Sequence, residues 1–162
     1  DVLIDEENTS PGSLNVYVIP SDLTASKSVA ESVKASIVGV VPMGISVTVK
    51  PIELVYVKPI ITLQTVSEGL DTTYYETTIS YILKGYLDNL PLMHKLTFAS
   101  VKQAIENSLE ADTEVIAVSL YKEDKYGIVF QIPFTDSYTL GKTEKFCSYP
   151  EDSVEILVEV SG

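Results

Sequence analysis

The segment YLDNLPLMHKL, residues 86–96, combines a carboxylate, Asp88, with His94, the single histidine of the chain. A hydrolytic triad requires a nucleophile, a base and an orienting acid, so any triad in this chain would have to use His94. The same segment carries Asn89, which suits a left-handed C-cap, and Pro91, which blocks continuation of a helix. We therefore interpret it as a corner that follows a helix, with His94 as a surface or interface residue.

Paired carboxylates and phosphate motifs give no stronger signal. Glu76 and Asp88 share a predicted helix, but they are separated by roughly 18 Å at about 1.5 Å per residue, whereas glycosidase carboxylates lie ~5–9.5 Å apart. The acidic run at 5–8 lacks the alternating ligands and central glycine of a calcium loop. Neither GxxxxGK[ST] nor GxGxxG occurs. The sequence thus offers no catalytic, cofactor-binding or metal-binding residue, and we expect a protein that is not an enzyme.

Composition narrows the class of partner. The 162-residue chain is 45% hydrophobic and has a net charge of −12, and all 11 of its basic residues are lysines. Without arginine, and with a negative field, nucleic-acid binding is not expected. The lone Cys147 excludes a disulfide framework within the chain. The most apolar run, 37–49, is interrupted by proline and glycine and is shorter than the ~20 residues of a membrane span.

The opening residues carry neither an initiating methionine nor the basic and apolar regions of a signal peptide. We therefore expect the chain to be a fragment of a larger protein.

Hydrophobic periodicity predicts the elements that must position these residues. Pro59 interrupts the longest predicted strand and denies one ladder donor, so we expect an edge, a bulge or a break there. The predicted helices are 24–39, 72–89 and 98–109. The predicted strands are 15–20, 45–51, 53–66, 113–121, 127–132 and 154–160, with a polar loop from 133 to 150.

This order predicts an α+β fold with two split β-α-β (ferredoxin-like) units, a mixed or antiparallel sheet with helices on one face, and a β-rich C-terminal tail. Residues 1–12 are expected to be a linker or the end of a preceding domain. Residues 13–52 form the first β-α-β module. Residues 53–162 form a second β-α-α-β module with a C-terminal β-hairpin and strand.

Several phrases resemble the C-terminal half of the baseplate J-like family, the wedge proteins of contractile phage tails and related injection machines. The resemblance covers about 11–120, beginning with PGSLNVYVIPSD and continuing through SVAESVKASI and VPMGISVTVKPIELVYVKPIITL. A family phrase P-x-G-x-x-V-x-V is matched by Pro42, Gly44, Val47 and Val49. A second phrase, Y-L-x-x-L-P-L-G, is matched by Tyr86, Leu87, Leu90, Pro91 and Leu92, with Met93 in place of its glycine. The following helix and strand match at Leu96, Phe98, Ser100, Ala104, Ile105, Val115, Ile116 and Val118.

The resemblance implies a structural role in a virion tail baseplate, reached through the host cytoplasm during assembly. Family members surround the tail hub, contact one another around a ring and rearrange when the sheath contracts. The implied partners are other baseplate subunits and copies of the chain itself, as a homo-oligomer. No catalytic residue comes with the resemblance, and residues 122–150 look like an insertion.

The strand at 53–66 and the helix at 72–89 are expected at or near a subunit contact, because an obligate interface is apolar at its centre. The candidate interface residues are Tyr56, Ile61, Leu63, Tyr75, Ile79 and Ile82. Two alternatives remain open, a small ferredoxin-like ligand-binding or regulatory domain and a tail-associated hydrolase.

Overall fold

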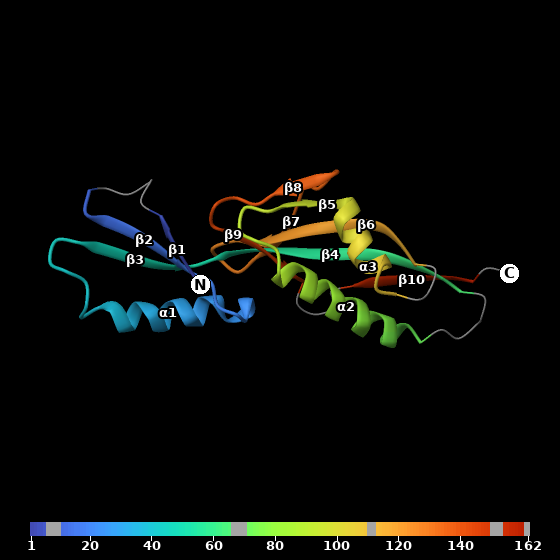
Figure 1. Ribbon diagram of the computed structural model, residues 1–162, viewed down its shortest axis with the longest axis horizontal. Helices are drawn as coiled ribbons and strands as arrows, with labels where there is room; N and C mark the ends of the chain where they lie inside the picture. The colour runs from blue at the N-terminus through green and yellow to red at the C-terminus, as the bar shows by residue number, and fades with distance from the viewer. Residues whose placement is uncertain (6–10, 66–70, 110–112, 150–153, 161–162) are drawn as a thin grey trace. The chain divides into compact units, whose positions relative to one another are not determined.

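A computed structural model describes residues 1–5, 11–65, 71–109, 113–149 and 154–160. It shows a mixed α+β chain that divides into two compact units, Asp1–Glu53 (unit 1) and Leu54–Gly162 (unit 2). Figure 1 shows the elements of each unit. The boundary falls at the first residue of the long strand that opens unit 2.

Unit 1 is a three-stranded sheet with one helix. Strand β2 (Ser13–Val18) lies between β1 (Val2–Asp5) and β3 (Ser46–Pro51), antiparallel to the first and parallel to the second. Helix α1 (Ser26–Ile37) connects β2 to β3, after a short 3-10 turn whose Thr24 amide donates to Asp22. Strand β1 therefore places residues 2–5 in this sheet, within the segment 1–12 that the sequence predicts to be a linker or the end of a preceding domain.

One face of the unit 1 sheet is apolar. The cross-strand partners Val2 and Val18, and Ile4 and Val16, share that face, since directly paired residues point the same way. Helix α1 packs mainly against β3 and β2. The side chains on β1 are less covered, and Val2 and Ile4 remain 59% and 55% exposed.

Unit 2 is organised on strand β4 (Glu53–Thr65). Along the sheet order β10-β4-β6-β7, β4 runs antiparallel to β6 (Thr113–Glu123) and parallel to β10 (Glu155–Val160), and β9 (Glu144–Ser148) also pairs with it. Strand β7 (Val129–Ile132) completes the order against β6. The ladder shifts register between Ile60 and Ile61, directly after Pro59. The irregularity predicted at Pro59 is thus present in the ladder, as a bulge or a similar register shift.

Two helices cover this sheet. Helix α2 (Thr72–Asp88) begins at Asp71, whose carboxylate accepts from the Thr73 and Tyr74 amides, and α3 (Phe98–Glu106) begins at a capping box of Thr97 and Ser100. The helices pack against each other, α2 also against β9 and β10, and α3 against β6. The fully buried core residues from the helices and β4 are Val55, Val57, Ile61, Leu63, Ile79, Leu83, Leu87, Val101 and Ile105.

The polar loop predicted at 133–150 is partly wrong. It contains β8 (Ser137–Thr139), which pairs with β5 (Lys95–Thr97), and the buried strand β9. The charged start of β9, Glu144 and Lys145, reads as loop in the sequence. Both side chains are only 8% exposed, because partners distant in sequence satisfy their charges.

The split arrangement is not confirmed by the observed strand orders. Within the described residues, β2 and β3 are direct neighbours, and so are β4 and β6, although a split β-α-β unit would place another strand between the connected pair. None of the described helices has the length and apolar character needed to cross a membrane.

The corner at 86–96 has an unexpected left-handed residue. Asn89, predicted to be left-handed, has a φ of −85°, whereas Met93 has a φ of 57°. Within the described residues, Met93 is the single non-glycine residue with a positive φ. Its side chain is 62% exposed, so no packing compensates for the strain of this conformation.

We predict that Met93→Gly stabilises the protein. Left-handed backbone costs a non-glycine residue about 1–2 kcal/mol, and the greater freedom of glycine in the unfolded chain offsets about 0.5–1 kcal/mol of this. The net gain should therefore be about 0.5–1 kcal/mol in urea unfolding. Met93→Val, which is β-branched, should lower stability instead. Equal stability of the two variants would show that this turn carries no strain.

Candidate functional site: a groove between α2 and β10

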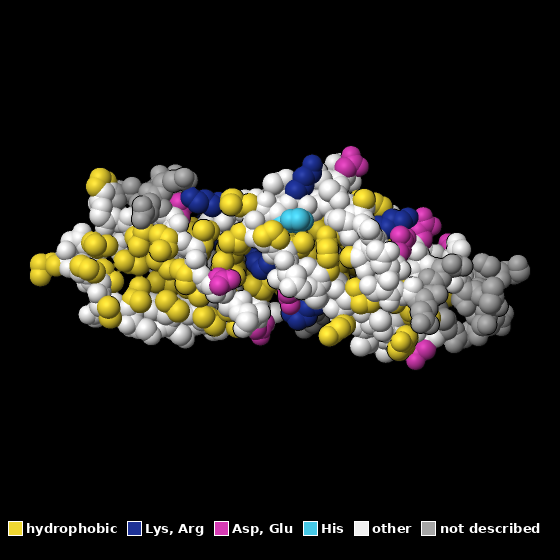
Figure 2. Space-filling model, viewed as in Figure 1, with side chains coloured by type: hydrophobic (Ala, Val, Ile, Leu, Met, Phe, Trp, Pro, Cys, Tyr) yellow, Lys and Arg dark blue, Asp and Glu magenta, His cyan; other side chains and the backbone are white. Residues whose placement is uncertain are grey.

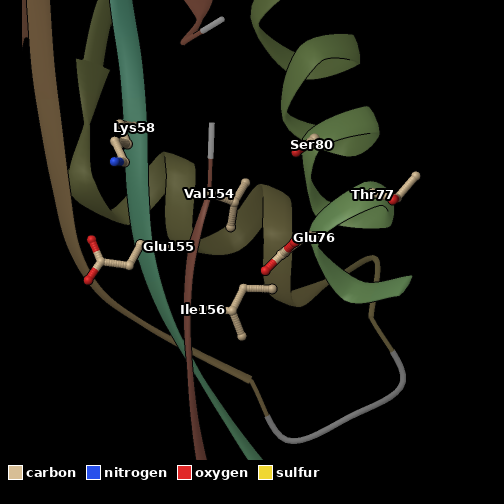
Figure 3. Close-up of a pocket in the computed structure, with 7 residues that line it drawn as sticks. All are labelled: Lys58, Glu76, Thr77, Ser80, Val154, Glu155 and Ile156. Atoms are coloured by element: carbon tan, nitrogen blue, oxygen red, sulfur yellow. The ribbon is translucent and has the colours of Figure 1, made fainter. Parts of the chain in front are cut away.

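Unit 2 contains a groove of about 580 Å³ between helix α2 and strand β10. Its volume falls in the range of about 300–1,000 Å³ typical of ligand sites. Figure 3 shows the lining side chains, which are Lys58, Glu76, Thr77, Ser80, Val154, Glu155 and Ile156.

The elements set the character of each side of the groove. Glu76 and Ser80 are four residues apart on α2 and therefore lie on the same helical face. In Figure 3, Val154 and Ile156 lie on the side of β10 that faces the helix, whereas Glu155 and Lys58 lie on the β4 side. Val154 is buried and Ile156 half-buried, so the groove has an apolar floor and polar flanks.

Lys58 is oriented by an aromatic cluster. Its Nζ lies 5.9 Å from the ring centroid of Tyr149, and Tyr149 makes edge-to-face contacts with Tyr56 at 5.8 Å and Tyr121 at 5.1 Å. Burial, together with the charge of Glu123, raises the pKa of Tyr56. A cation near an aromatic face is attracted by the ring, so the cluster holds Lys58 beside the groove.

The carboxylate pair considered from the sequence does not form this site. Glu76 lines the groove together with Glu155, while Asp88 lies at the other end of α2 and accepts a hydrogen bond from Lys84 at 2.9 Å. His94 contributes its carbonyl oxygen to the Leu140 amide at 3.1 Å. Its side chain does not line the groove.

The groove carries carboxylate, ammonium and hydroxyl groups, which suit hydrogen bonding and ion pairing with a bound partner. In the part of the chain that the structure describes, no cluster of three or more His, Cys, Asp or Glu residues is arranged to hold a metal ion.

The six candidate interface residues divide into two groups. Ile61, Leu63 and Ile79 are fully buried and Tyr56 is 8% exposed, so these four side chains build the interior of unit 2. Tyr75 and Ile82 are half-buried on α2, and both can still reach a partner. A role at a subunit contact stays a prediction for this helix.

Two buried charges hold β9 in the framework. Glu144 accepts from Lys122 Nζ at 2.5 Å, from the Gly141 amide at 2.7 Å and from the Tyr138 hydroxyl at 3.3 Å. Burial alone would raise the pKa of Glu144, but these hydrogen bonds and the Lys122 charge outweigh it and lower the pKa. The ion pair therefore links β9 to β6.

Lys145 joins β9 to the end of α2. Its Nζ donates to the carbonyl oxygens of Leu90 at 2.6 Å and Asp88 at 3.4 Å, where the helix leaves carbonyls without partners. Burial lowers the pKa of Lys145, and the charge of Asp88 partly opposes that shift.

Unit 1 carries a different kind of surface, an apolar tip at residues 38–45 between α1 and β3. Val38, Val40 and Met43 are 79%, 77% and 103% exposed, and the tip contains no charged residue. Figure 2 shows hydrophobic side chains gathered over the elements of unit 1. Exposed apolar groups in this number mark contact surfaces in soluble proteins.

In comparisons with known proteins, no family model matches the sequence, and no curated protein matches it.

The groove residues Lys58, Thr77, Ser80 and Glu155 were not identified from the sequence. The alternation of 154–160 indicates which side chains share a face. Nothing in it indicates that β10 lies beside α2.

We predict a pH-dependent contribution from Glu144. Because its pKa is lowered from 4.5, the native state stays ionised where the unfolded chain takes up a proton. Its stabilisation is therefore present above the ordinary pKa and is lost as pH falls through the folded value. Glu144→Gln should lower the free energy of unfolding at pH 7 by about 1–3 kcal/mol, as for a charged hydrogen bond.

The measurement is urea unfolding from pH 7 down to pH 3, with Glu159→Gln, at an exposed position on β10, as the control. The gap between wild type and Glu144→Gln should narrow toward the acid end. A gap that stays constant with pH would contradict the assignment.

Proposed function

We propose that this chain is a structural part of a contractile phage tail baseplate, a wedge of the J-like kind that acts by assembly with other proteins. The observation that carries the proposal is the conformation of Met93. The family phrase has glycine at this position, and the chain keeps the left-handed backbone that glycine favours although it carries methionine there. Because the left-handed turn is present despite its energetic cost to methionine, it supports a relationship to the family over residues 86–93.

Surface chemistry supports an assembly role. The uncharged tip at 38–45 and the exposed Val2 and Ile4 give unit 1 an apolar surface, while the net charge of −12 favours solubility before partners bind. We propose that other wedge subunits and copies of the chain cover this surface in the virion. We also propose that the units are related to ferredoxin-like folds. In both units, helices connect strands of one sheet and pack on that sheet.

The buried ionisable groups support a non-enzymatic role. Glu144 forms an ion pair with Lys122, and Lys145 donates a hydrogen bond to a carbonyl oxygen at the end of α2. These contacts position β9, and neither side chain lines the groove between α2 and β10. A tail-associated hydrolase would instead require ionisable groups that converge on a substrate.

A ligand-binding regulatory domain is the second candidate, and the volume of the groove favours it. It would bind a small metabolite in the groove and show a thermal shift with that ligand as a monomer or simple dimer. The flanks of the groove are exposed, with Glu76, Thr77 and Glu155 open to solvent, which fits a long occupant better than an enclosed small molecule.

We predict that the double variant Val40→Glu/Met43→Glu folds normally but is not incorporated into tails. Both side chains are exposed, so the substitutions cost the unit little packing, yet they place two charges on a surface that must be desolvated on assembly. Purified particles would be analysed by immunoblot and by immunogold electron microscopy. Wild-type protein should label the baseplate end of the tail.

Tyr126→Glu/Ile128→Glu in unit 2 is a matched control, because these side chains are 75% and 61% exposed and lie outside the tip. It should be incorporated normally. A wild-type chain absent from particles, or a tip variant incorporated as well as wild type, would refute the proposed role of the tip in assembly.

A further inference from the structure

We propose that the groove between α2 and β10 binds an extended, lysine- or arginine-bearing segment of a partner protein, which adds to the sheet as a strand beside β10. This inference rests on the proposed assembly role and specifies the kind of partner that one surface of the chain takes.

The first observation is the open edge of β10. This strand ends the sheet order and pairs along its length with β4, from Glu155 opposite Ile60 to Val160 opposite Thr65. Among the described strands, none pairs with its other edge. The outward backbone groups of such an edge are a template for another strand.

The second observation is that β10 lacks the features that protect edges. Charged lysines and prolines commonly block unwanted pairing. Strand β3, which ends the sheet of unit 1, carries Lys50 and Pro51, whereas β10 reads EILVEV and has neither residue type. Leu157 and Val158 are 44% and 38% exposed on it. The edge is therefore suited to pairing.

The third observation is the helix beside this edge. Helix α2 packs against β10 and forms the opposite wall of the groove with Glu76, Thr77 and Ser80. Peptides that bind by strand addition pair with an exposed sheet edge, where main-chain hydrogen bonds give affinity and side-chain pockets give specificity. Val154 and Ile156 supply an apolar floor for alternate side chains of the added strand.

Charge selects the occupant. Glu76 and Glu155 line the groove, and Glu159 lies further along β10. Among the described lining residues the one cation is Lys58, whose ammonium lies near the Tyr149 ring. A second copy of β10 would bring two more glutamates to this acidic edge, and like charges directly opposite one another are destabilising. A partner strand with lysine or arginine is complementary instead.

The test uses the full chain with two fluorescent synthetic peptides, KVTVKVTV and EVTVEVTV. The basic peptide should bind saturably in fluorescence anisotropy, with affinity that falls as salt is raised. It should shift the amide NMR signals of β10 and of the 76–80 segment of α2. The acidic peptide should bind at least about tenfold more weakly, because like charges oppose docking. KVPVKVPV, whose prolines remove ladder donors, should not bind.

The variant Glu76→Lys/Glu155→Lys should weaken binding of the basic peptide by at least about tenfold through lost charge complementarity. Glu31→Lys/Asp136→Lys makes the same change in net charge at exposed residues that do not line the groove and should leave the affinity within about twofold. Amide signals and thermal unfolding confirm that both variants are folded.

The inference is overturned if the basic peptide shows no saturable binding, if both charged peptides bind equally, or if the shifted signals lie elsewhere. It is also overturned if the groove variant disrupts self-association of the chain, since the occupant would then be a second copy. The particle experiments on the tip at 38–45 are independent. If the peptides do not bind but the wild-type chain labels the baseplate, only the proposed partner is rejected. If the basic peptide binds but the wild-type chain is not incorporated into tails, only the baseplate role is rejected.

Discussion

The structure of unit 2 depends on the pairing of β4 along both of its edges. Strand β6 pairs with it on one side, and β10 pairs with its C-terminal half. The short strand β9 also pairs with it, as the Tyr149 amide donates to the Val57 carbonyl. Val55, Val57, Ile61 and Leu63 lie fully buried along β4. An extended strand can bury such a row only if its backbone groups are also paired, which β4 achieves with segments from the end of the chain.

Local signals predicted the elements that local physics controls. Hydrophobic periodicity was sufficient to predict a helix at 72–89, close to the observed α2, and Pro59 was sufficient to predict an irregularity in the long strand. Strand β9 was missed because its stability comes from distant partners. Glu144 pairs with Lys122, and Lys145 reaches the carbonyl of Leu90, 55 residues away. Hydrophobic periodicity is judged over about 11–18 residues, so it cannot reveal contacts between residues much further apart in the sequence.

The same limit applies to the site. Glu76 and Asp88 were considered from the sequence as a carboxylate pair. Helical geometry correctly predicted that they lie too far apart to act together. The structure brings Glu76 to the same groove as Glu155, because β10 pairs with β4 beside α2. Strand order is a long-range property, and a parallel strand at the end of the chain is hard to place from periodicity alone. The left-handed turn was predicted four residues too early, at Asn89 instead of Met93.

These features describe a framework with open contact surfaces. Buried charges fix β9, and the apolar interior fixes the helices, while the tip at 38–45 and the β10 edge remain available. Such an arrangement suits binding by shape and by strand pairing. The groove carries charged side chains suited to recognition. The buried charges of Glu144 and Lys145 make their contacts within unit 2.

Amide hydrogen exchange of the full chain, followed residue by residue by NMR, tests this account most directly. Amides of β4 between residues 55 and 63 should exchange only through global unfolding, since both edges and the core protect them. In β10, amides directed toward β4 should be protected, and the alternate amides directed away from it should exchange rapidly. Uniform protection along β10, or exchange in β4 as fast as in β7, would contradict both the central role of β4 and the open edge.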